Sequence, residues 1–272
     1  MNNITSVILA AGKSSRFKHS KSKIFQDLAG QSIIEHVYEI AKKISKEKII
    51  FVCNENNKHE LQILFPKSIL VIQKKQNGTA DAIYQAKKYL INKNVLILFA
   101  DAPLISISSI NKMILNFKKN KSIGSMIAFK TKNPFGYGRL LIEGAYVSGV
   151  IEELNATKIQ KKINLCNSGV MLCNSNLLFS NISKITDKNK KKEKYLPDIF
   201  NIFNKINKSF SYVLGREEEM LGINSLKDLI KIDEIYQNYL RDKVIRKGVI
   251  LIKPDSIRLS YDTKIKSSAI IE

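Results

Sequence analysis

Short apolar runs recur through the first part of the chain and are separated by longer amphipathic segments. The runs lie at 4–10, 48–53, 69–73 and 95–100 and consist mostly of apolar residues, many of them β-branched. Each has the length of a strand, and such mostly apolar runs are typical of strands buried on both faces of a parallel sheet. The pattern therefore predicts four buried strands near the amino terminus.

The amphipathic segments between these runs predict helices. Ser32 and Glu35 have the spacing of a capping box, and the apolar positions that follow them fall on one stripe. Thr79 is expected to cap a second helix that runs to about Leu90, and a third helix is expected over 106–117. Strand and helix alternate with short connections, so we predict a doubly wound α/β fold with a mixed, mostly parallel sheet.

Beyond this region the pattern changes. Residues 125–173 are strand-like with Gly-rich turns, which predicts strands added to one side of the sheet. The lysine-rich stretch 187–194 is interpreted as a solvated loop. Residues 225–247 have helical periodicity and predict a linking arm.

The last stretch of the chain, 248–272, has a period of its own. Leu259, Ile265 and Ile271 recur every six residues, which is the spacing of one coil of a left-handed hexapeptide β-helix. We therefore expect a main domain over 1–224, a helical linker arm over 225–247 and the first coil of a truncated β-helix over 248–272.

Composition and charge narrow the class of protein. With 272 residues, of which 44% are hydrophobic, the chain is long and apolar enough to form a buried core. Its 45 Lys and Arg against 24 Asp and Glu leave a net charge of +21, which attracts anions without saying which ones. The three cysteines form no metal-binding or disulfide pattern, and no apolar run approaches a membrane span. A cytoplasmic protein that associates with no membrane is expected.

One loop carries the residue types that phosphate binding needs. Leu9, Ala10, Ala11 and Gly12 lie at and just after the end of the first predicted strand. The bases Lys13 and Arg16 follow them, and Lys23 stands seven residues beyond Arg16. Small residues let backbone N–H groups approach phosphate oxygens, and the bases neutralise their charge. An ordinary strand-to-helix turn with surface bases explains the same residues equally well.

A series of motifs in chain order resembles a known family. The segment from Leu9 to Phe17 resembles the L-x-x-G-x-G-T-R-M signature of sugar-phosphate nucleotidyltransferases, with Lys23 at the lysine of its P-K pair. Further matches follow at the Q-x-x-Q-L-G-T-A-H-A, Y-G-D-x-P-L, G-Y-G-R, I-V-E-x-K-D-A-T, N-T-G, E-Y-Y-L-T-D and G-V-N motifs, which begin here at Gln73, Phe99, Gly136, Val150, Asn167, Glu193 and Gly222.

Together these motifs resemble the uridyltransferase part of the bacterial bifunctional N-acetylglucosamine-1-phosphate uridyltransferase and glucosamine-1-phosphate acetyltransferase family. The resemblance implies a Rossmann-like nucleotidyltransferase fold that joins UTP and N-acetylglucosamine 1-phosphate into UDP-N-acetylglucosamine and pyrophosphate, a precursor step for peptidoglycan and lipopolysaccharide. The acetyltransferase part is expected to be missing. Ser14 and Ser22 depart from the motifs, replacing a Gly and a Pro.

The resemblance implies roles for the bases and for a metal. Lys13 and Arg16 would hold the leaving β- and γ-phosphates, and Lys23 would bridge the α-phosphate and the sugar phosphate. Asp101 and Asn224 match the ligands of Mg²⁺, a hard cation suited to phosphate oxygens. From the residues alone, Asp101 could equally cap a helix or stand in a turn.

The resemblance also implies substrate contacts. Gln73 and Gly78 would read the uracil, although a glutamine at a strand end needs no such role. The amino sugar would be bound by Gly138, Glu152 and Asn167, with Thr79 nearby. The remaining expected substrate contacts are Leu9, Ala10, Ala11, Gly12, Phe99, Ala100 and Asn224.

Three alternatives stay open at this point. The same chemistry with another sugar phosphate or nucleotide fits the shared phosphate loop. A basic nucleic-acid-binding protein would explain the net charge of +21, although the lysine pairs lack interleaved aromatics and no nucleic acid is expected as a partner. A non-catalytic relative would explain Ser14 and Ser22. The oligomeric state is left open.

Overall fold

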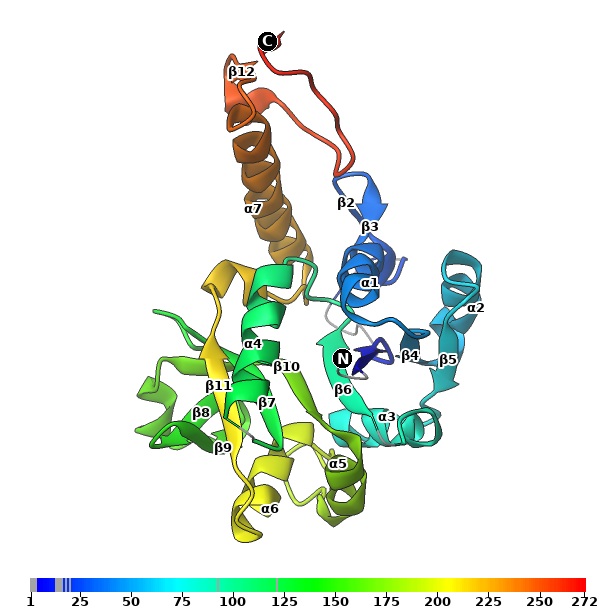
Figure 1. Cartoon of the computed structure of the whole chain (residues 1–272), viewed down its shortest axis with the longest axis vertical. Coiled ribbons are helices and arrows are strands. Elements are labelled where there is room, and N and C mark those ends of the chain that lie inside the picture. Colours follow the sequence, from blue (N-terminus) through cyan, green and yellow to red (C-terminus); the bar gives the residue numbers. More distant parts are fainter. Residues whose placement is uncertain (1–3, 13–16, 18, 20, 92, 121) are drawn as a thin grey trace.

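The computed structural model describes residues 4–12, 17, 19, 21–91, 93–120 and 122–272 of the chain. A body with a central sheet carries an arm made of one long helix and the carboxy-terminal segment (Figure 1). Among the described residues the strands are β1 Ile4–Leu9, β2 Asp27–Leu28, β3 Gln31–Ser32, β4 Ile50–Cys53, β5 Ile69–Ile72, β6 Asn94–Phe99, β7 Gly124–Lys130, β8 Arg139–Glu143, β9 Tyr146–Ile151, β10 Leu165–Asn174, β11 Phe210–Leu214, β12 Ile250–Leu251 and β13 Ile270–Ile271. The α-helices there are α1 Ile33–Ile44, α2 Glu55–Leu64, α3 Thr79–Gln85, α4 Ile107–Lys119, α5 Ser175–Asn181, α6 Ile199–Lys205 and α7 Leu226–Ile245.

The sheet is mixed. Within the described residues it has nine strands in the order β5-β4-β1-β6-β10-β7-β11-β9-β8. The first four of these are parallel neighbours, with Val7 of β1 opposite Ile50 of β4 and Ile97 of β6. β10 then runs antiparallel to both β6 and β7, and β9 runs antiparallel to both β8 and β11. The predicted α/β fold with a mixed sheet is confirmed. Its parallel pairings are those among β5, β4, β1 and β6 and that between β7 and β11.

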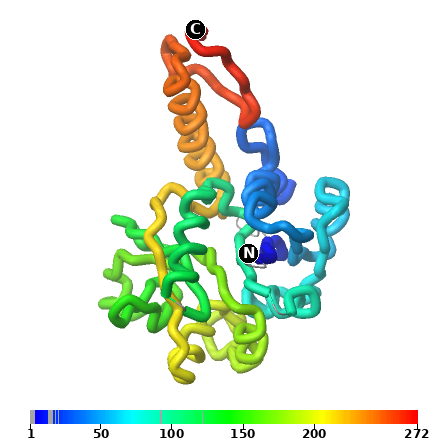
Figure 2. The backbone as a smooth tube through the Cα atoms, in the orientation of Figure 1, coloured from blue at the N-terminus to red at the C-terminus, as the bar shows by residue number. Residues whose placement is uncertain are grey.

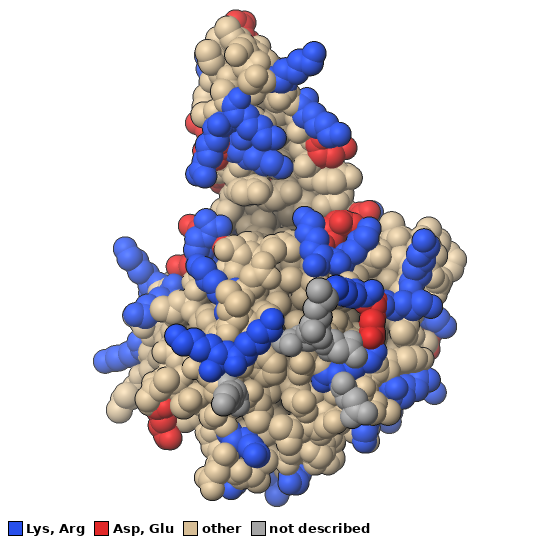
Figure 3. Space-filling view, in the orientation of Figure 1, with Lys and Arg blue, Asp and Glu red and all other residues tan. Residues whose placement is uncertain are grey.

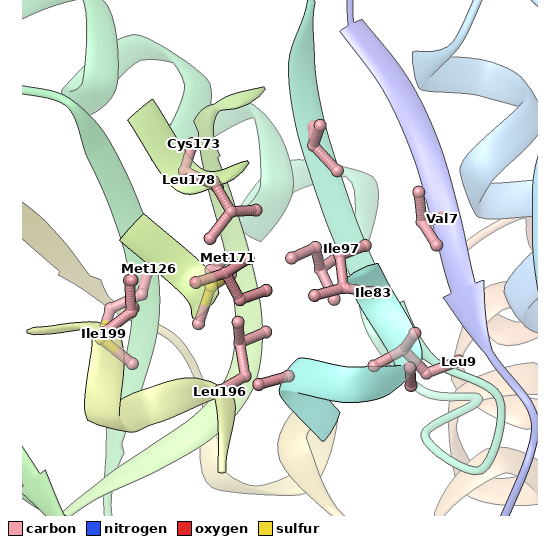
Figure 4. Close-up of a cluster of buried hydrophobic side chains, with 14 of the residues drawn as sticks. Val7, Leu9, Ile83, Ile97, Met126, Met171, Cys173, Leu178, Leu196 and Ile199 are labelled. Carbon is pink, nitrogen blue, oxygen red and sulfur yellow. The ribbon is translucent and has the colours of Figure 1, made fainter. Parts of the chain in front are cut away.

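Helices cover both faces of this sheet and bury the apolar runs. On one face α3, α5 and α6 pack on a cluster that includes Val7, Ile97 and Met171 (Figure 4). On the other face α1, α2 and α4 pack on a cluster that includes Ile8 and Leu96. Alternate strand residues therefore pack against opposite layers, which explains why the predicted strands are mostly apolar.

The local signals behind the helices are mostly as predicted. Glu35 Oε2 accepts from the backbone N and the hydroxyl of Ser32, at 2.7 and 2.6 Å, so the capping box that opens α1 is confirmed. The helix expected over 106–117 is α4, capped by Ser106, whose hydroxyl accepts from Ser109 N at 3.1 Å. The helix α2 has no long apolar stripe that would predict it from the sequence, because it buries little more than Leu61 against the body.

The expected role of Thr79 as a helix cap is wrong. Gly78 is the N-cap residue of α3 and has no side chain to cap it with. The hydroxyl of Thr79 instead accepts a hydrogen bond from Leu196 N at 2.9 Å. The helix is also shorter than expected, because α3 ends at Gln85 and a 3₁₀ turn over Lys87–Tyr89 follows it.

The arm extends away from the body, and the middle of the carboxy-terminal segment runs back to the amino-terminal region near Ala29 (Figure 2). α7 and the carboxy-terminal segment enclose a small core with the β2–β3 hairpin, and Tyr261 N donates to Ala29 O at 2.8 Å. Gln237 of α7 bonds both backbone groups of Leu259, at 2.9 and 2.8 Å. β12 and β13 pair in parallel, and Ile265 and Ile271 pack against the same core. The assignment of this segment to a β-helix, and the domain boundaries, stay predictions.

Candidate active site

A cleft with a volume of about 590 Å³ lies where the carboxyl ends of β1, β5 and β6 meet. This edge is where open α/β sheets bind their ligands. Most of the predicted site residues line it: Leu9, Ala10, Ala11, Gly12, Lys23, Gln73, Gly78, Thr79, Phe99, Ala100, Asp101, Glu152, Asn167 and Asn224. Residues predicted from motifs spread over the chain thus share one cleft, while their individual roles stay predictions.

The loop that leaves β1 is held from behind by α2. Asn57 Nδ2 donates to Ala10 O at 2.7 Å, and Asn54 Nδ2 donates to Ala11 O at 3.2 Å. These two asparagines also cap α2, so the start of the loop is fixed to a helix end. At Gly12 a Cβ atom would find open space, which leaves room for a ligand against the backbone. Lys13 and Arg16, predicted to hold phosphates, lie outside the described residues.

Lys23, Asp101 and Asn224 meet at the end of the cleft beside this loop. The Lys23 ammonium forms an ion pair with Asp101 Oδ2 and donates to Ile223 O at 2.7 Å and to Asn224 Oδ1 at 3.4 Å. Lys23 begins the 3₁₀ turn Lys23–Phe25, Asp101 follows β6, and Asn224 precedes the cap residue of α7. Three distant segments therefore place one cation between three oxygens.

This convergence tests whether the two predicted metal ligands fit a metal. The oxygens of Asp101 and Asn224 both face a single positive charge, and both are the hard donors that Mg²⁺ prefers. The described residues contain no group of three or more His, Cys, Asp and Glu that could hold an ion unaided. A pair of protein oxygens fits Mg²⁺, because that ion keeps positions for water and substrate phosphates.

The opposite wall of the cleft is formed by the loop between β5 and α3. Gln73 is 4% exposed, and its Nε2 donates to Gly78 O at 3.1 Å and to Asp81 Oδ2 at 2.7 Å. Gly78 has φ +105°, and a Cβ atom there would lie 2.4 Å from Lys194 O. Only glycine fits this contact, so the loop requires Gly78 for backbone reasons independent of any ligand.

A segment that we call the strap, residues 193–197, crosses this loop. Lys194 N donates to Asn77 O at 2.7 Å, and Ala80 N donates to Lys194 O at 2.9 Å. Glu193 and Tyr195 of the strap line the cleft, as does Lys191 just before it. The segment predicted as a solvated loop, 187–194, is mostly exposed, and its residues Lys191 and Glu193 also border the cleft. The motif match that begins at Glu193 was the available signal, but no role had been assigned to these side chains.

Glu152, Asn167 and Gly138 lie together on the third side of the site. Asn167 lies at an irregularity of β10, and its backbone N donates to Gly138 O at 2.8 Å. A Cβ atom at Gly138 would lie 3.2 Å from Glu152 Oε1. Gly138 itself is behind the residues that line the cleft, so it shapes this side through its backbone.

Burial sets the charge state of this side. Desolvation raises the pKa of Glu152, and the nearby carboxylate of Asp198 raises it further. Desolvation also raises the pKa of Asp198, and that of Tyr195 to about 12. Acidic side chains with raised pKa values, together with Tyr195, therefore gather near this part of the cleft, and Lys191 also lines it. Such groups suit the hydroxyls of a neutral ring better than they suit phosphate.

A buried ion pair supports the same side from behind. Arg139 is 1% exposed and pairs with Glu153 Oε2 at 2.6 Å, while Gly136 N donates to that carboxylate at 3.3 Å. Desolvation alone would raise the pKa of Glu153, but the hydrogen bonds from Arg139 and Gly136 lower it overall. The pair joins the turn before Gly138 to the segment that follows Glu152.

Comparisons with known proteins identify the family of the chain. Residues 6–167 match the MobA-like NTP transferase domain. The chain belongs to the MobA-like NTP transferase family. It is a nucleotidyltransferase, as the motif series predicted.

The relatives of this nucleotidyltransferase match almost all of the chain. It is 37% identical over 255 residues to the bifunctional protein GlmU of Buchnera aphidicola subsp. Schizaphis graminum, covering 93% of the chain and 55% of that protein. It is 32% identical to the GlmU of Paramagnetospirillum magneticum, covering 95% and 58%. The nucleotidyltransferase therefore spans a little over half the length of these relatives.

A structural likeness supports the fold. A UDP-glucose pyrophosphorylase complexed with UDP-glucose superposes with a TM-score of 0.69 at 18% identity, covering 88% of this chain and all of that one.

None of the helices formed by the described residues is both long and apolar enough to cross a bilayer.

Proposed function

We propose that this nucleotidyltransferase joins UTP and N-acetylglucosamine 1-phosphate to give UDP-N-acetylglucosamine and pyrophosphate. The observation that carries the proposal is the meeting, in one cleft, of Lys23, Asp101 and Asn224 at one end with Glu152 and Asn167 at another. A polyanion and a hydroxylated ring need these two kinds of surroundings side by side. The similarity to bifunctional GlmU proteins supports the same substrates.

The reaction is a phosphoryl-group displacement that needs no protein nucleophile. A phosphate oxygen of the sugar 1-phosphate forms a bond to the α-phosphorus of UTP, while the bond from that phosphorus to the β-phosphate bridging oxygen breaks. Pyrophosphate leaves with the electron pair of the broken bond. The enzyme contributes alignment of the two oxygens and neutralisation of the charge that develops.

Lys23 is proposed to supply part of that neutralisation. It is placed beside the β1 loop by its own 3₁₀ turn, within reach of a phosphate that rests on the backbone of Gly12. Lys23 now bonds the oxygens of Asp101 and Ile223. When substrate binds, phosphate oxygens would take the place of these protein oxygens. Lys13 and Arg16 are proposed to hold the leaving β- and γ-phosphates.

Asp101 and Asn224 are proposed to hold Mg²⁺. When bound, the ion would neutralise phosphate charge and fix the orientation of the triphosphate. Asp101 is positioned at the end of β6, and Ile223 N donates to Asp101 O at 2.9 Å, which fixes the two ligand-bearing segments to each other.

The experiment that tests the function is a pyrophosphate-release assay with UTP, CTP, dTTP and GTP, each combined with several sugar 1-phosphates. The proposal predicts Mg²⁺-dependent release that is fastest with UTP and N-acetylglucosamine 1-phosphate. Folded protein that releases no pyrophosphate with this pair would overturn it. Faster release with another pair would assign the same chemistry to a different sugar phosphate or nucleotide.

The other partners and the location stay proposals. The predicted small-molecule substrates account for the bases of the cleft, whereas most of the net charge of +21 lies elsewhere. In the face shown by Figure 3, Lys and Arg side chains are scattered over the body and the arm. A cytoplasmic enzyme without nucleic-acid or membrane partners remains our proposal.

A further inference from the structure

The side-chain amide of Gln73 can adopt only one orientation in this structure. Gln73 directly follows β5, and its backbone N donates to Cys53 O at 2.8 Å, so the residue continues the sheet. Its Nε2 has two partners, Gly78 O and Asp81 Oδ2. A carbonyl and an ionised carboxylate can only accept hydrogen bonds, so the NH₂ end must point toward them. The other end of the amide, Oε1, accepts no hydrogen bond from the described residues.

Asp81 is the residue that makes this orientation strong. It lies in the first turn of α3, and its Oδ2 accepts from Gln73 at 2.7 Å while its Oδ1 accepts from Gln85 Nε2 at 3.1 Å. Gln73 is buried and Gln85 is exposed. The motif that this segment resembles has a histidine where this chain has Asp81, and a histidine ring can donate as well as accept. A carboxylate removes that ambiguity.

The backbone of Gly78 provides the complementary group. Its carbonyl is already used, accepting from Gln73 and from Ala82 N at 3.1 Å. Its N–H bonds to no acceptor in the part of the chain that the structure describes. Gly78 and Gln73 both line the cleft, and the contact of Lys194 with Gly78 prevents the loop from shifting outward. One fixed acceptor and one fixed donor therefore lie in the same wall.

We propose that Asp81 is a specificity-determining positioning residue, which holds the Gln73 amide so that the cleft reads an N–H next to a carbonyl on the nucleotide base. This inference rests on the proposed function and deepens it. Uracil and thymine offer such an edge, with N3–H as donor and a ring carbonyl as acceptor. Cytosine offers the reverse pattern, an acceptor at N3 and an amino group beside it. Its N3 would face the Gln73 Oε1 acceptor, and its amino group would face the Gly78 N–H donor.

The discrimination comes from polar groups that cannot turn around. A site built to hydrogen-bond one edge rejects the wrong partner strongly, because its buried groups are then left unpaired. If Gln73 could rotate by 180° about its last bond, its NH₂ would serve the N3 acceptor of cytosine and much of the rejection would be lost. Asp81 opposes that rotation, since it would bring the amide oxygen against the carboxylate.

The test compares UTP and CTP in four proteins: the wild type, Asp81→Leu, Asp81→Asn and Gln85→Ala. Steady-state kcat/KM is measured for both nucleotides with one sugar 1-phosphate, and nucleotide binding is measured by calorimetry. The wild type is expected to prefer UTP by at least about 100-fold. Asp81→Leu should lower this preference to below about 10-fold, mainly by raising KM for UTP. Asp81→Asn can present either an acceptor or a donor to Gln73, so its preference should lie between those of the wild type and Asp81→Leu.

The remaining comparisons separate the possible outcomes. Gln85→Ala removes the exposed partner of the same carboxylate and should leave the preference unchanged. Asp81→Ala replaces the leucine variant if thermal unfolding shows that the latter is not folded. Equal losses of kcat/KM for UTP and CTP in the leucine or alanine variant would reduce Asp81 to a structural role and overturn the inference. A wild type that does not use UTP would instead overturn the proposed function.

Discussion

The ammonium of Lys23 is paired with the carboxylate of Asp101 at the point where the two predicted metal ligands converge. The side chains are 11% and 24% exposed, so the pair is only partly solvated. The lysine therefore competes with a divalent ion for the same carboxylate oxygen. Metal binding and the release of Lys23 toward phosphate are expected to accompany each other.

This competition predicts opposite effects on metal binding and on turnover. Lys23→Met should bind Mn²⁺ more tightly, on the order of 3- to 10-fold, because the carboxylate is no longer neutralised. Its turnover should nevertheless fall at least about 100-fold, because a charge that stabilises the reacting phosphates is lost. Asp101→Ala should lose both metal binding and turnover. Metal binding is measured by calorimetry or electron paramagnetic resonance without nucleotide.

Lys21→Met is the matched control, since Lys21 is exposed in the same loop and no ion pair is formed by it among the described residues. It should change Mn²⁺ affinity by less than about 2-fold. A Lys23→Met variant that binds Mn²⁺ no better than the wild type would show that the two cations do not compete.

The buried carboxylate of Glu152 is expected to lower the stability of the protein at neutral pH while it improves substrate binding. Burial, followed by Asp198, raises its pKa above the ordinary value in the folded protein. Its favourable contribution is therefore present below that ordinary pKa and is lost as the pH rises through the raised pKa. Glu152→Gln removes the buried charge and should raise Tm by about 2 °C at pH 7.5, with little difference near pH 4.5. KM for the sugar 1-phosphate should rise at least about 10-fold.

Glu143→Gln serves as the control for this pH dependence, because Glu143 is an exposed carboxylate at the end of β8. Its Tm should match the wild type at both pH values. The interpretation fails if Glu152→Gln is less stable than the wild type at pH 7.5.

Much of the fold could be predicted because its signals are local. The strands β4 and β5 are continuous apolar runs, and β1 and β6 are mostly apolar. The capping box of α1 is visible within four residues of sequence. Local signals fail where a contact is made by distant residues. The hydroxyl of Thr79 looked like a cap, but Leu196, which is 117 positions away, uses it.

The candidate site shows the same division. Motif matches brought Lys23, Asp101 and Asn224 into one hypothesis, and the cleft places them together. The pairing of Lys23 with Asp101 could not be read from the sequence, since 78 positions separate them. Gly78 was predicted to contact the uracil. The packed structure reveals a second reason for a glycine at this position, which is the close approach of the Lys194 backbone.

The ion pair between Arg139 and Glu153 predicts a structural effect with a specific functional signature. Glu153→Gln leaves a buried guanidinium without its counter-charge, which should lower the free energy of unfolding by about 3 kcal/mol. The turn before Gly138 should loosen, so KM for the sugar 1-phosphate should rise more than KM for UTP. Urea unfolding and steady-state kinetics measure the two effects.

Lys161→Met is the control for that prediction. Lys161 lies 3.5 Å from the same carboxylate, but its side chain is 48% exposed. Its loss should change the free energy of unfolding by less than about 0.5 kcal/mol, because exposed pairs contribute little. Equal effects of the Glu153 and Lys161 variants would show that the Arg139 pair is not the important contact.

Glu219 is expected to stabilise the fold and, because it lies near Asn224 in the chain, to affect the position of that predicted metal ligand. Its buried carboxylate accepts from the hydroxyls of Ser106 and Ser109 at 2.9 and 2.6 Å and pairs with Arg216 at 2.7 Å. It thereby fixes the 3₁₀ turn Glu217–Met220 to the start of α4, only a few residues before Asn224. Glu219→Ala should lower the free energy of unfolding by about 2 kcal/mol and should also weaken Mn²⁺ binding.

The pH dependence of this effect has a definite sign. Desolvation alone would raise the pKa of Glu219, but hydrogen bonds from Ser109, Arg216 and Ser106 lower it overall. The stabilisation is therefore present above the ordinary pKa of a glutamate and is lost as the pH falls through the lowered pKa. The gap in urea stability between the wild type and Glu219→Ala should be full at pH 7.5 and should narrow below about pH 4. Glu218→Ala changes an exposed residue of the same turn and should have the same urea stability as the wild type at both pH values. If the stability lost in Glu219→Ala does not vary with pH, the effect comes from packing and not from the charge of Glu219.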